Sequence, residues 1–156
     1  MSESTADLWD ARSEELMSCD VQFRSYGANQ SFCGPVRTVR CHEDNHLVKR
    51  LLNSPGSGSV LVVDGGGSLR SALVGDQIGA AAVANGWAGI VIYGAVRDSG
   101  ALSGLDLGIK ALGTNPRRSS KTGEGSVDES VAFGGAIFVP GVHLWADVDG
   151  IVVEIG

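Results

Sequence analysis

A run of twenty uncharged residues between Asp76 and the Arg97-Asp98 pair constrains this 156-residue chain more than any other feature. The run reads QIGAAAVANGWAGIVIYGAV, and it is long enough for a helix that spans a membrane. Asn85-Gly86 interrupts its middle, however, and the composition changes from alanine-rich before this pair to Ile, Val and Tyr after it. That pattern is typical of a helix, a turn and a strand. We therefore expect no membrane span and no membrane partner.

The two halves of the run have matching lengths. A helix over about Gly75–Asn85 would rise roughly 16 Å at 1.5 Å per residue. A strand over about Gly89–Tyr93 would return roughly 17 Å at 3.3 Å per residue. Because the chain reverses between the two, the start of the helix and the end of the strand should lie at the same edge of the fold. The spacing predicts that Asp76 lies near Arg97 and Asp98.

The groups expected at this edge suit a small anion held beside a divalent cation. The first turn of a helix offers unpaired backbone N–H groups, here those of residues 76–78, and the positive end of the helix dipole. Gly75 has no side chain to obstruct a ligand. Arg97 supplies a planar guanidinium that matches a carboxylate or phosphate, and Asp98 supplies a hard oxygen ligand for Mg²⁺ or Mn²⁺. The alternative is that these charges only cap a helix and form a solvated ion pair.

The rest of the chain alternates between helix and strand before it becomes all strand. Thr5 is expected to cap a helix that runs to about Met17. The next expected elements are strands over 21–27 and 34–42, a helix within 43–53 and a buried strand over 59–64. Short strands and a polar loop follow Asp98, and then strands joined by Gly-Gly, Pro-Gly and Asp-Gly turns fill 133–156. The sequence predicts a single α/β domain over residues 1–156 with a β-rich last third.

Charge and composition exclude several classes of function. The chain has 18 acidic and 12 basic residues, for a net charge of -6, which repels a phosphate backbone, so no direct nucleic-acid partner is expected. The three cysteines form no C-x-x-C pair. The stretch MSESTADLWDARSEEL carries acids where a signal peptide needs basic and then apolar residues. A reduced, cytoplasmic protein is predicted.

Five stretches of the sequence resemble the RraA-like family; they are VLVVDGGGSLRSALVGD, GWAGIVIYGAVRD, LDLGIKALGTNPRRS, FGGAIFVPG and ADVDGIVV. This family contains regulators of ribonuclease E and metal-dependent 4-hydroxy-4-methyl-2-oxoglutarate aldolases, and the similarity runs from about Asp7 to Gly156. Its aldolases carry an acid, twenty residues and then Arg-Asp, which Asp76 and Arg97-Asp98 match. The resemblance implies a β/β/α fold of the phosphohistidine-swivelling-domain type. It also implies a homotrimer or a hexamer of two stacked trimers, with sites near the subunit interfaces.

The resemblance also implies roles for individual residues. Asp98 would bind a divalent metal cation, Mg²⁺ or Mn²⁺, partly through water, and Asp76 would position a metal-bound water for proton transfer. The groups that would hold the pyruvate moiety of a small 2-oxoacid substrate are Arg97 and the backbone around Gly75, Asp76, Gln77 and Ile78. These roles predict a lyase that cleaves 4-hydroxy-2-oxoacids to pyruvate and decarboxylates oxaloacetate through the same pyruvate enolate. The alternative is a regulator that binds a ribonuclease or another protein without catalysis.

Four smaller features have competing interpretations. The family's aldolases can carry an acid near the C-terminus that reaches a neighbouring subunit's site, and the last acid here is Glu154. VLVVDGGGS resembles a methyltransferase cofactor loop, but G-x-G-x-x-G is absent and a tight turn is favoured. CHEDNH could bind a metal, although helix capping explains it more simply. Arg117, Arg118 and Lys121 form a basic loop that could contact an anion or an acidic partner, although a solvated loop is favoured.

Overall fold

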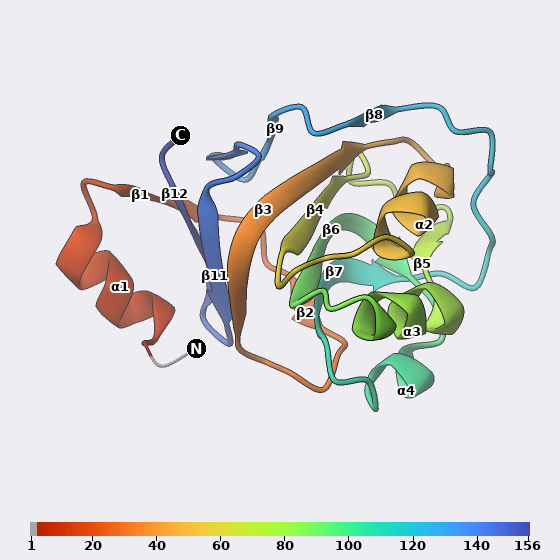
Figure 1. Cartoon of the computed structure of the whole chain (residues 1–156), viewed down its shortest axis with the longest axis horizontal. Coiled ribbons are helices and arrows are strands. Elements are labelled where there is room, and N and C mark those ends of the chain that lie inside the picture. The colour runs from red at the N-terminus through yellow and green to blue at the C-terminus, as the bar shows by residue number, and fades with distance from the viewer. Residues whose placement is uncertain (1–2) are drawn as a thin grey trace.

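A parallel sheet of four strands forms the centre of the computed structural model, which describes residues 3–156 (Figure 1). In spatial order, these strands are β3 (Phe32–Arg40), β4 (Val60–Asp64), β6 (Gly89–Val96) and β7 (Gly108–Thr114). The segments that connect them carry α2 (His46–Leu52), β5 (Ala72–Val74), α3 (Asp76–Ala84) and α4 (Ser99–Leu102). The three helices lie on the same side of the sheet, as Figure 1 shows.

Antiparallel strands extend this sheet at both of its edges. On one side β11 (His143–Asp147) pairs with β3, β12 (Gly150–Glu154) pairs with β11, and β1 (Leu16–Cys19) pairs with β12. On the other side β2 (Arg24–Ser25) pairs with β7. The remaining strands are β8 (Ser126–Val127), which pairs with β3, and the hairpin of β9 (Val131–Phe133) and β10 (Ala136–Phe138). Helix α1 (Thr5–Arg12) lies against β11 and β12.

Alternate residues of the central strands face two different cores. Leu61 and Val63 of β4 belong to the core beneath α2 and α3, whereas Val60 and Val62 belong to the core that contains Phe138 and the β-rich layer. Because both faces are covered, β4 and β6 are apolar almost without interruption. The layers are therefore helices, a parallel sheet and a second β layer. This is the mixed α/β single domain with a β-rich last third that the sequence predicted.

The uncharged run between Asp76 and Arg97 forms a helix, a turn and a strand, as expected. Helix α3 ends at Ala84, Gly86 adopts a φ of 78° in the turn, and β6 begins at Gly89. Strand β6 continues to Val96, beyond the predicted end at Tyr93, because β5 and β7 both pair with its last residues. Among the helices of residues 3–156, none combines the length and the apolar character that crossing a membrane requires.

The N-terminal boundaries differ from those predicted. The first helix ends at Arg12, and Leu16 and Met17, which we expected in that helix, lie in β1 and pair with β12. Of the strand expected over 21–27, only Arg24–Ser25 pairs. In both places a pairing with a distant segment decides the structure, and local propensity does not reveal it.

The cap of α1 is also different from the prediction. Ser4 is the capping residue, and its hydroxyl accepts a hydrogen bond from the Asp7 N–H at 3.1 Å. Thr5 donates its N–H and its hydroxyl to the carboxylate of Asp147, at 2.8 and 2.7 Å. Thr5 therefore ties the first helix to the end of β11 instead of capping it.

Candidate functional site

Helix α3 and strand β6 bring the predicted charges together at the carboxyl edge of the parallel sheet, where ligands commonly bind in open α/β sheets. Oδ2 of Asp98 accepts a hydrogen bond from the backbone N–H of Asp76 at 3.0 Å, across 22 residues of sequence. Nε of Arg97 lies 3.9 Å from the same oxygen. The predicted neighbourhood of Asp76, Arg97 and Asp98 is confirmed.

The close approach of Asp98 requires glycine at position 75. A Cβ at Gly75 would lie 2.7 Å from Oδ2 of Asp98 and 3.3 Å from Nε of Arg97. The backbone itself is extended, with φ -125°, so the requirement is one of space and not of conformation. Any side chain here would push the carboxylate away from the start of α3.

Asp98 leaves β6 in the left-handed conformation, with φ 56° and ψ 41°. Asp and Asn adopt this conformation more readily than other residues with side chains. Within residues 3–156 no hydrogen-bond donor contacts its second oxygen, Oδ1, and the side chain is 39% exposed. One carboxylate oxygen is therefore free to bind a cation.

The backbone N–H groups at the start of α3 differ in their availability. The Asp76 N–H is already bonded to Asp98, contrary to the expectation that all three groups would be free. The N–H groups of Gln77 and Ile78 have no acceptor in the part of the chain that the structure describes. An incoming anion therefore meets two free N–H groups and not three.

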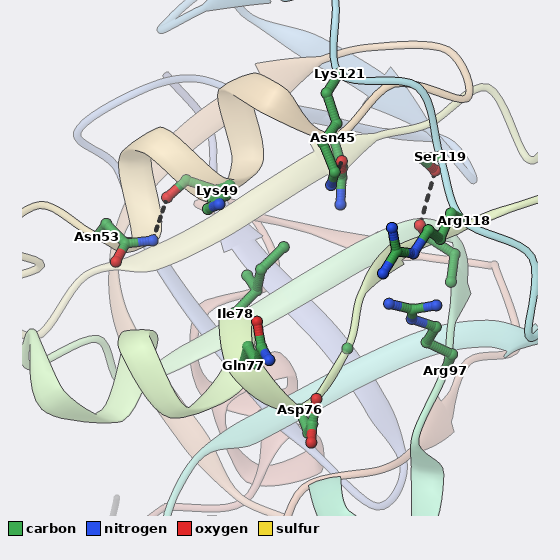
Figure 2. A pocket seen from close by; sticks show the side chains of 12 residues that line it. Asn45, Lys49, Asn53, Asp76, Gln77, Ile78, Arg97, Arg118, Ser119 and Lys121 are labelled. Atoms are coloured by element: carbon green, nitrogen blue, oxygen red, sulfur yellow. Dashed lines mark hydrogen bonds between the residues drawn. The ribbon is translucent and has the colours of Figure 1, made fainter.

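A cleft of about 340 Å³ opens beside these groups, between α2, α3 and the loop that follows β7 (Figure 2). This volume is at the lower end of the range of about 300–1,000 Å³ that is usual for small-molecule sites. The predicted residues that line it are Gly75, Asp76, Gln77, Ile78 and Arg97. The unpredicted polar residues that line it are Asn45, Lys49, Asn53, Arg118, Ser119 and Lys121.

The basic side chains of the loop after β7 are exposed, as expected for a solvated loop, but two of them, Arg118 and Lys121, also line the site. The Ser119 hydroxyl donates to the carbonyl of Ala72 at 2.7 Å, and the Ser120 N–H donates to the carbonyl of Glu43 at 2.8 Å. These bonds hold the loop across the parallel sheet, so that Arg118 and Lys121 line the cleft. No short-range pattern in the sequence marks these residues, since only the fold of distant segments brings them here.

The CHEDNH stretch is structural. Asp44 is buried, and its carboxylate accepts hydrogen bonds from the N–H groups of Thr122 at 2.7 Å, His46 at 3.1 Å and Gly123 at 3.3 Å. Burial opposes ionisation of Asp44, but these bonds and one from the Thr122 hydroxyl together hold its pKa below the ordinary value. Burial raises the pKa of the neighbouring Cys41 thiol to about 12, which makes it unreactive.

The donor set fits a hydrated Mg²⁺ or Mn²⁺. In the described residues 3–156, no three His, Cys, Asp or Glu side chains gather in a way that could hold a metal ion. Asp98 does not itself line the cleft, but it contacts Asp76 and Arg97, which do, and it offers one free carboxylate oxygen. Mg²⁺ commonly keeps several waters and binds through one or two carboxylates together with oxygens of its substrate. The residues present therefore fit the metal that the resemblance implies, and Asp98 would be its protein ligand.

The glycine-rich turn after β4 is closed by its own hydrogen bonds. The N–H groups of Gly65 and Gly67 both donate to the Tyr93 carbonyl at 3.1 Å, and that of Gly66 donates to Oδ1 of Asp64 at 2.9 Å. These donors are not available to a carboxylate or phosphate of a cofactor. The arrangement favours a tight structural turn over a methyltransferase loop.

The Glu154 carboxylate is hydrogen-bonded by residues of its own chain. Its carboxylate accepts hydrogen bonds from the His143 N–H at 2.8 Å and from the guanidinium of Arg12 at 3.0 Å. These contacts, first the one from His143, hold the pKa of Glu154 below its ordinary value. The residue therefore stabilises the packing of α1 and β12 here.

Comparisons with known proteins identify the family to which this fold belongs. The model of the RraA-like family, described as Aldolase/RraA, matches residues 5–153. This chain belongs to the RraA-like family. The protein named S-adenosylmethionine: 2-dimethylmenaquinone methyltransferase from Geobacillus kaustophilus is 44% identical, with a TM-score of 0.96 over 97% of this chain and 94% of that one. The RNA-processing inhibitor RraA from Thermus thermophilis is 43% identical, with a TM-score of 0.95 over 99% of this chain and 93% of that one.

A third relative in the RraA-like family is more distant in sequence. RraAS2 from Streptomyces coelicolor, an unusual member of the RNase ES inhibitor RraA protein family, is 28% identical. Its TM-score is 0.74 over 96% of this chain and 77% of that one. The names of RraA-like proteins thus include aldolases and ribonuclease inhibitors, so the choice of function depends on the chemistry of the site.

Proposed function

We propose that this RraA-like protein is a divalent-metal-dependent lyase. It would cleave 4-hydroxy-4-methyl-2-oxoglutarate and related 4-hydroxy-2-oxoacids to pyruvate, and it would decarboxylate oxaloacetate. The observation that carries the proposal is the 3.0 Å contact between Asp98 and the start of α3, with Arg97 beside it at a small cleft. A protein that acts only through its outer surface has no need of this arrangement.

The substrate carboxylate would lie between the Arg97 guanidinium and the free N–H groups of Gln77 and Ile78. A guanidinium can donate two parallel hydrogen bonds to a carboxylate, and the positive end of a helix favours an anion. Arg97 also donates to the carbonyl of Pro116 at 3.5 Å, and its backbone N–H donates to the carbonyl of Val74 at 3.0 Å. The guanidinium is therefore held toward the cleft before the substrate arrives.

Aldol cleavage would break the bond between C3 and C4 of the substrate. A base takes the proton of the 4-hydroxyl, a carbonyl forms at C4, and the electron pair of the broken bond gives pyruvate enolate, which is then protonated at C3. Oxaloacetate reaches the same enolate by loss of its C4 carboxylate as CO₂. A divalent cation held by Asp98 would supply positive charge beside the enolate. Arg97 adds a second positive charge, and the exposed carboxylate of Asp76 would position a water that carries protons.

The test is pyruvate formation from oxaloacetate and from 4-hydroxy-4-methyl-2-oxoglutarate, with Mg²⁺ or Mn²⁺, in a coupled assay. We expect the wild type to release pyruvate from both and Asp98→Ala to be slower by about 10³-fold, a barrier increase of about 4 kcal/mol. A wild type that releases no pyruvate from either substrate with either metal rejects the enzyme. Unchanged activity in Asp98→Ala removes this residue from the mechanism.

Regulation of a ribonuclease is the second candidate function. It is favoured by the 43% identity to the RNA-processing inhibitor RraA from Thermus thermophilis. The net charge of -6 disfavours direct contact with RNA, so the partner would be the ribonuclease itself. Inhibition of a purified ribonuclease E by wild type and Asp98→Ala alike would establish this role as independent of the cleft. Absence of inhibition by either protein would reject it.

We also propose a cytoplasmic homotrimer, or a hexamer of two stacked trimers, as the resemblance implies. Large apolar side chains are exposed on the single chain and would be available to such an interface; they are Trp9, Leu69, Ile137, Val148 and Ile155. Light scattering on the 16.1 kDa chain should give a mass of three or six copies. A monomeric mass would reject the assembly.

A further inference from the structure

Asn115 directly follows β7 and links three segments that meet beside the cleft. Its backbone N–H donates to the carbonyl of Val96, the residue before Arg97, at 3.0 Å. Its side-chain Nδ2 donates to the carbonyl of Leu69, in the loop between β4 and β5, at 2.8 Å. Its Oδ1 accepts the N–H of Arg117 at 3.0 Å. Asn115 does not line the cleft, so any effect it has there passes through its neighbours.

The bond from Arg117 to Asn115 fixes the peptide plane that Arg97 contacts. The peptide between Pro116 and Arg117 is trans, and its carbonyl accepts a hydrogen bond from Nη1 of Arg97 at 3.5 Å. The N–H of the same peptide is the one that Asn115 accepts. Because a trans peptide is planar and its N–H and C=O point in opposite directions, holding the N–H also aims the carbonyl. The Asn115 side chain therefore sets the direction of the acceptor for Arg97.

The Arg97 guanidinium has little else to orient it. Within residues 3–156, the Pro116 carbonyl is the one group that accepts a hydrogen bond from it, and its nearest carboxylate oxygen, on Asp98, lies 3.9 Å from Nε. The Arg97 side chain is 36% exposed. A long side chain that is free to rotate loses conformational entropy when it binds a ligand. The direction of the Pro116 carbonyl therefore decides how well Arg97 is oriented before the substrate arrives.

We propose that Asn115 is a positioning residue for Arg97. Through the peptide between Pro116 and Arg117, it holds the guanidinium in the direction that binds the substrate carboxylate. This inference rests on the proposed function and adds to it a residue outside the cleft. Asn115 touches neither the substrate nor the metal, so its removal acts only where the Arg97 guanidinium is present.

A double-mutant cycle on kcat/KM for oxaloacetate tests this dependence. Asn115→Ala removes both side-chain hydrogen bonds, keeps the backbone N–H, and should lower kcat/KM by about tenfold. Arg97→Lys lacks the planar fork of the guanidinium, and in this background Asn115→Ala should change kcat/KM by less than about twofold. Asn29→Ala is the matched control, because the Asn29 amide also links two loops, donating to Asp106 at 2.9 Å near the start of β7. It should leave kcat/KM unchanged.

A second measurement does not depend on activity. The ¹⁵N–¹H NOE of the Arg97 Nε–H group, assigned by its absence in Arg97→Lys, reports motion of the guanidinium on the ps–ns timescale. It should fall in Asn115→Ala and keep the wild-type value in Asn29→Ala. Asn115→Asp retains the oxygen that accepts from Arg117 and should keep most of the NOE.

Three results would overturn the inference and leave the lyase proposal standing. They are an equal loss of kcat/KM in both backgrounds, an NOE that does not fall in Asn115→Ala, and an NOE that falls as far in Asn115→Asp as in Asn115→Ala. A wild type that forms no pyruvate, with an NOE that falls as expected, would overturn the lyase proposal and leave the positioning of Arg97 standing.

Discussion

Asp98 and Asp147 are carboxylates at the ends of strands in one sheet, and their surroundings are opposite. Asp147 is buried at the end of β11 and accepts hydrogen bonds from the Thr5 N–H at 2.8 Å, the Thr5 hydroxyl at 2.7 Å and the Asp149 N–H at 3.0 Å. Asp98 has a side chain that is 39% exposed and accepts one hydrogen bond, from Asp76. The donors around Asp147 fix the first helix, whereas Asp98 keeps an oxygen for a ligand.

The same contrast separates the regions around these two residues. At the end of α1, Arg12 is paired with Glu15 at 2.7 Å and with Glu154 at 3.0 Å. Around the cleft, Lys49 and Lys121 have no carboxylate partner within residues 3–156. Paired and hydrogen-bonded charge contributes to the stability of the fold, whereas converging unpaired charge is available to a ligand. The environment of a charged residue, more than its type, therefore distinguishes the site from the scaffold.

Of the three substitutions that test this contrast, Gly75→Ala should have the largest effect, because it would displace the Asp98 carboxylate. The added Cβ would lie 2.7 Å from Oδ2 of Asp98, so the carboxylate must move away from the start of α3. Steady-state pyruvate assays should show a fall in kcat/KM of about 10²-fold, as is usual when a functional group moves by about 1 Å.

Gly100→Ala is the matched control for this substitution. Gly100 lies on α4, and a Cβ there would have no atom within 4 Å, so activity should be unchanged. A Gly75→Ala variant that is as active as Gly100→Ala would show that the position of Asp98 does not matter to the reaction.

A smaller effect, on stability alone, is expected from Asp147→Asn. The amide keeps the shape of the side chain but loses its charge and one acceptor, so one donor of Thr5 is left without its partner. Urea denaturation should show a loss of about 2 kcal/mol in the free energy of unfolding. The kcat/KM of the folded protein should stay at the wild-type value.

The control for Asp147→Asn is Asp149→Asn, which changes an exposed carboxylate in the same turn and should be nearly neutral. A loss of activity in Asp147→Asn that exceeds its loss of folded protein would mean that the two regions are coupled. The separation of stabilising charge from functional charge would then be wrong.

The smallest effect is expected from Arg12→Met, because the pair of Arg12 with Glu154 is about one-third exposed. The loss in the free energy of unfolding should be small at pH 7, because solvent screens the pair. The folded-state pKa of Glu154 is depressed, so the pair contributes fully above the ordinary glutamate pKa of about 4.3. The contribution is lost as the pH falls through the folded-state pKa. Denaturation of wild type and variant should therefore converge in acid, whereas a difference that grows in acid would contradict this assignment.

The end of the cleft that contains Asp76 and Arg97 was predictable because its parts are close in the sequence. Asp76 and Asp98 are 22 residues apart and flank one helix and one strand, whose lengths can be compared directly. Helix α3 must run antiparallel to β6 to connect β5 and β6 in a parallel sheet. This connection places the start of α3 next to the end of β6.

The end of the cleft that contains Lys49 and Lys121 could not be predicted in the same way. Lys49 and Lys121 meet only because β3 and β7 occupy set positions in the sheet, and no local pattern encodes the order of strands. Leu16 and Met17 show the same limit, since their pairing with β12 overrides the extension of a helix. For residues that only the order of strands brings together, the sequence favoured local interpretations. Examples are a solvated loop for Lys121 and a longer first helix for Leu16 and Met17.

The left-handed backbone conformation at Asp98 limits which residues can replace it during evolution. With φ 56°, residue 98 favours Gly, Asn and Asp, and only Asp among these carries a negative charge. Replacement by Glu would keep the charge at an added backbone cost of about 1 kcal/mol, and it would also lengthen the side chain beside Gly75. Replacement by Asn or Gly would keep the backbone and remove the charge. Members of a lineage that changes residue 98 to Asn or Gly would therefore lose, in one step, the carboxylate that we propose as the metal ligand.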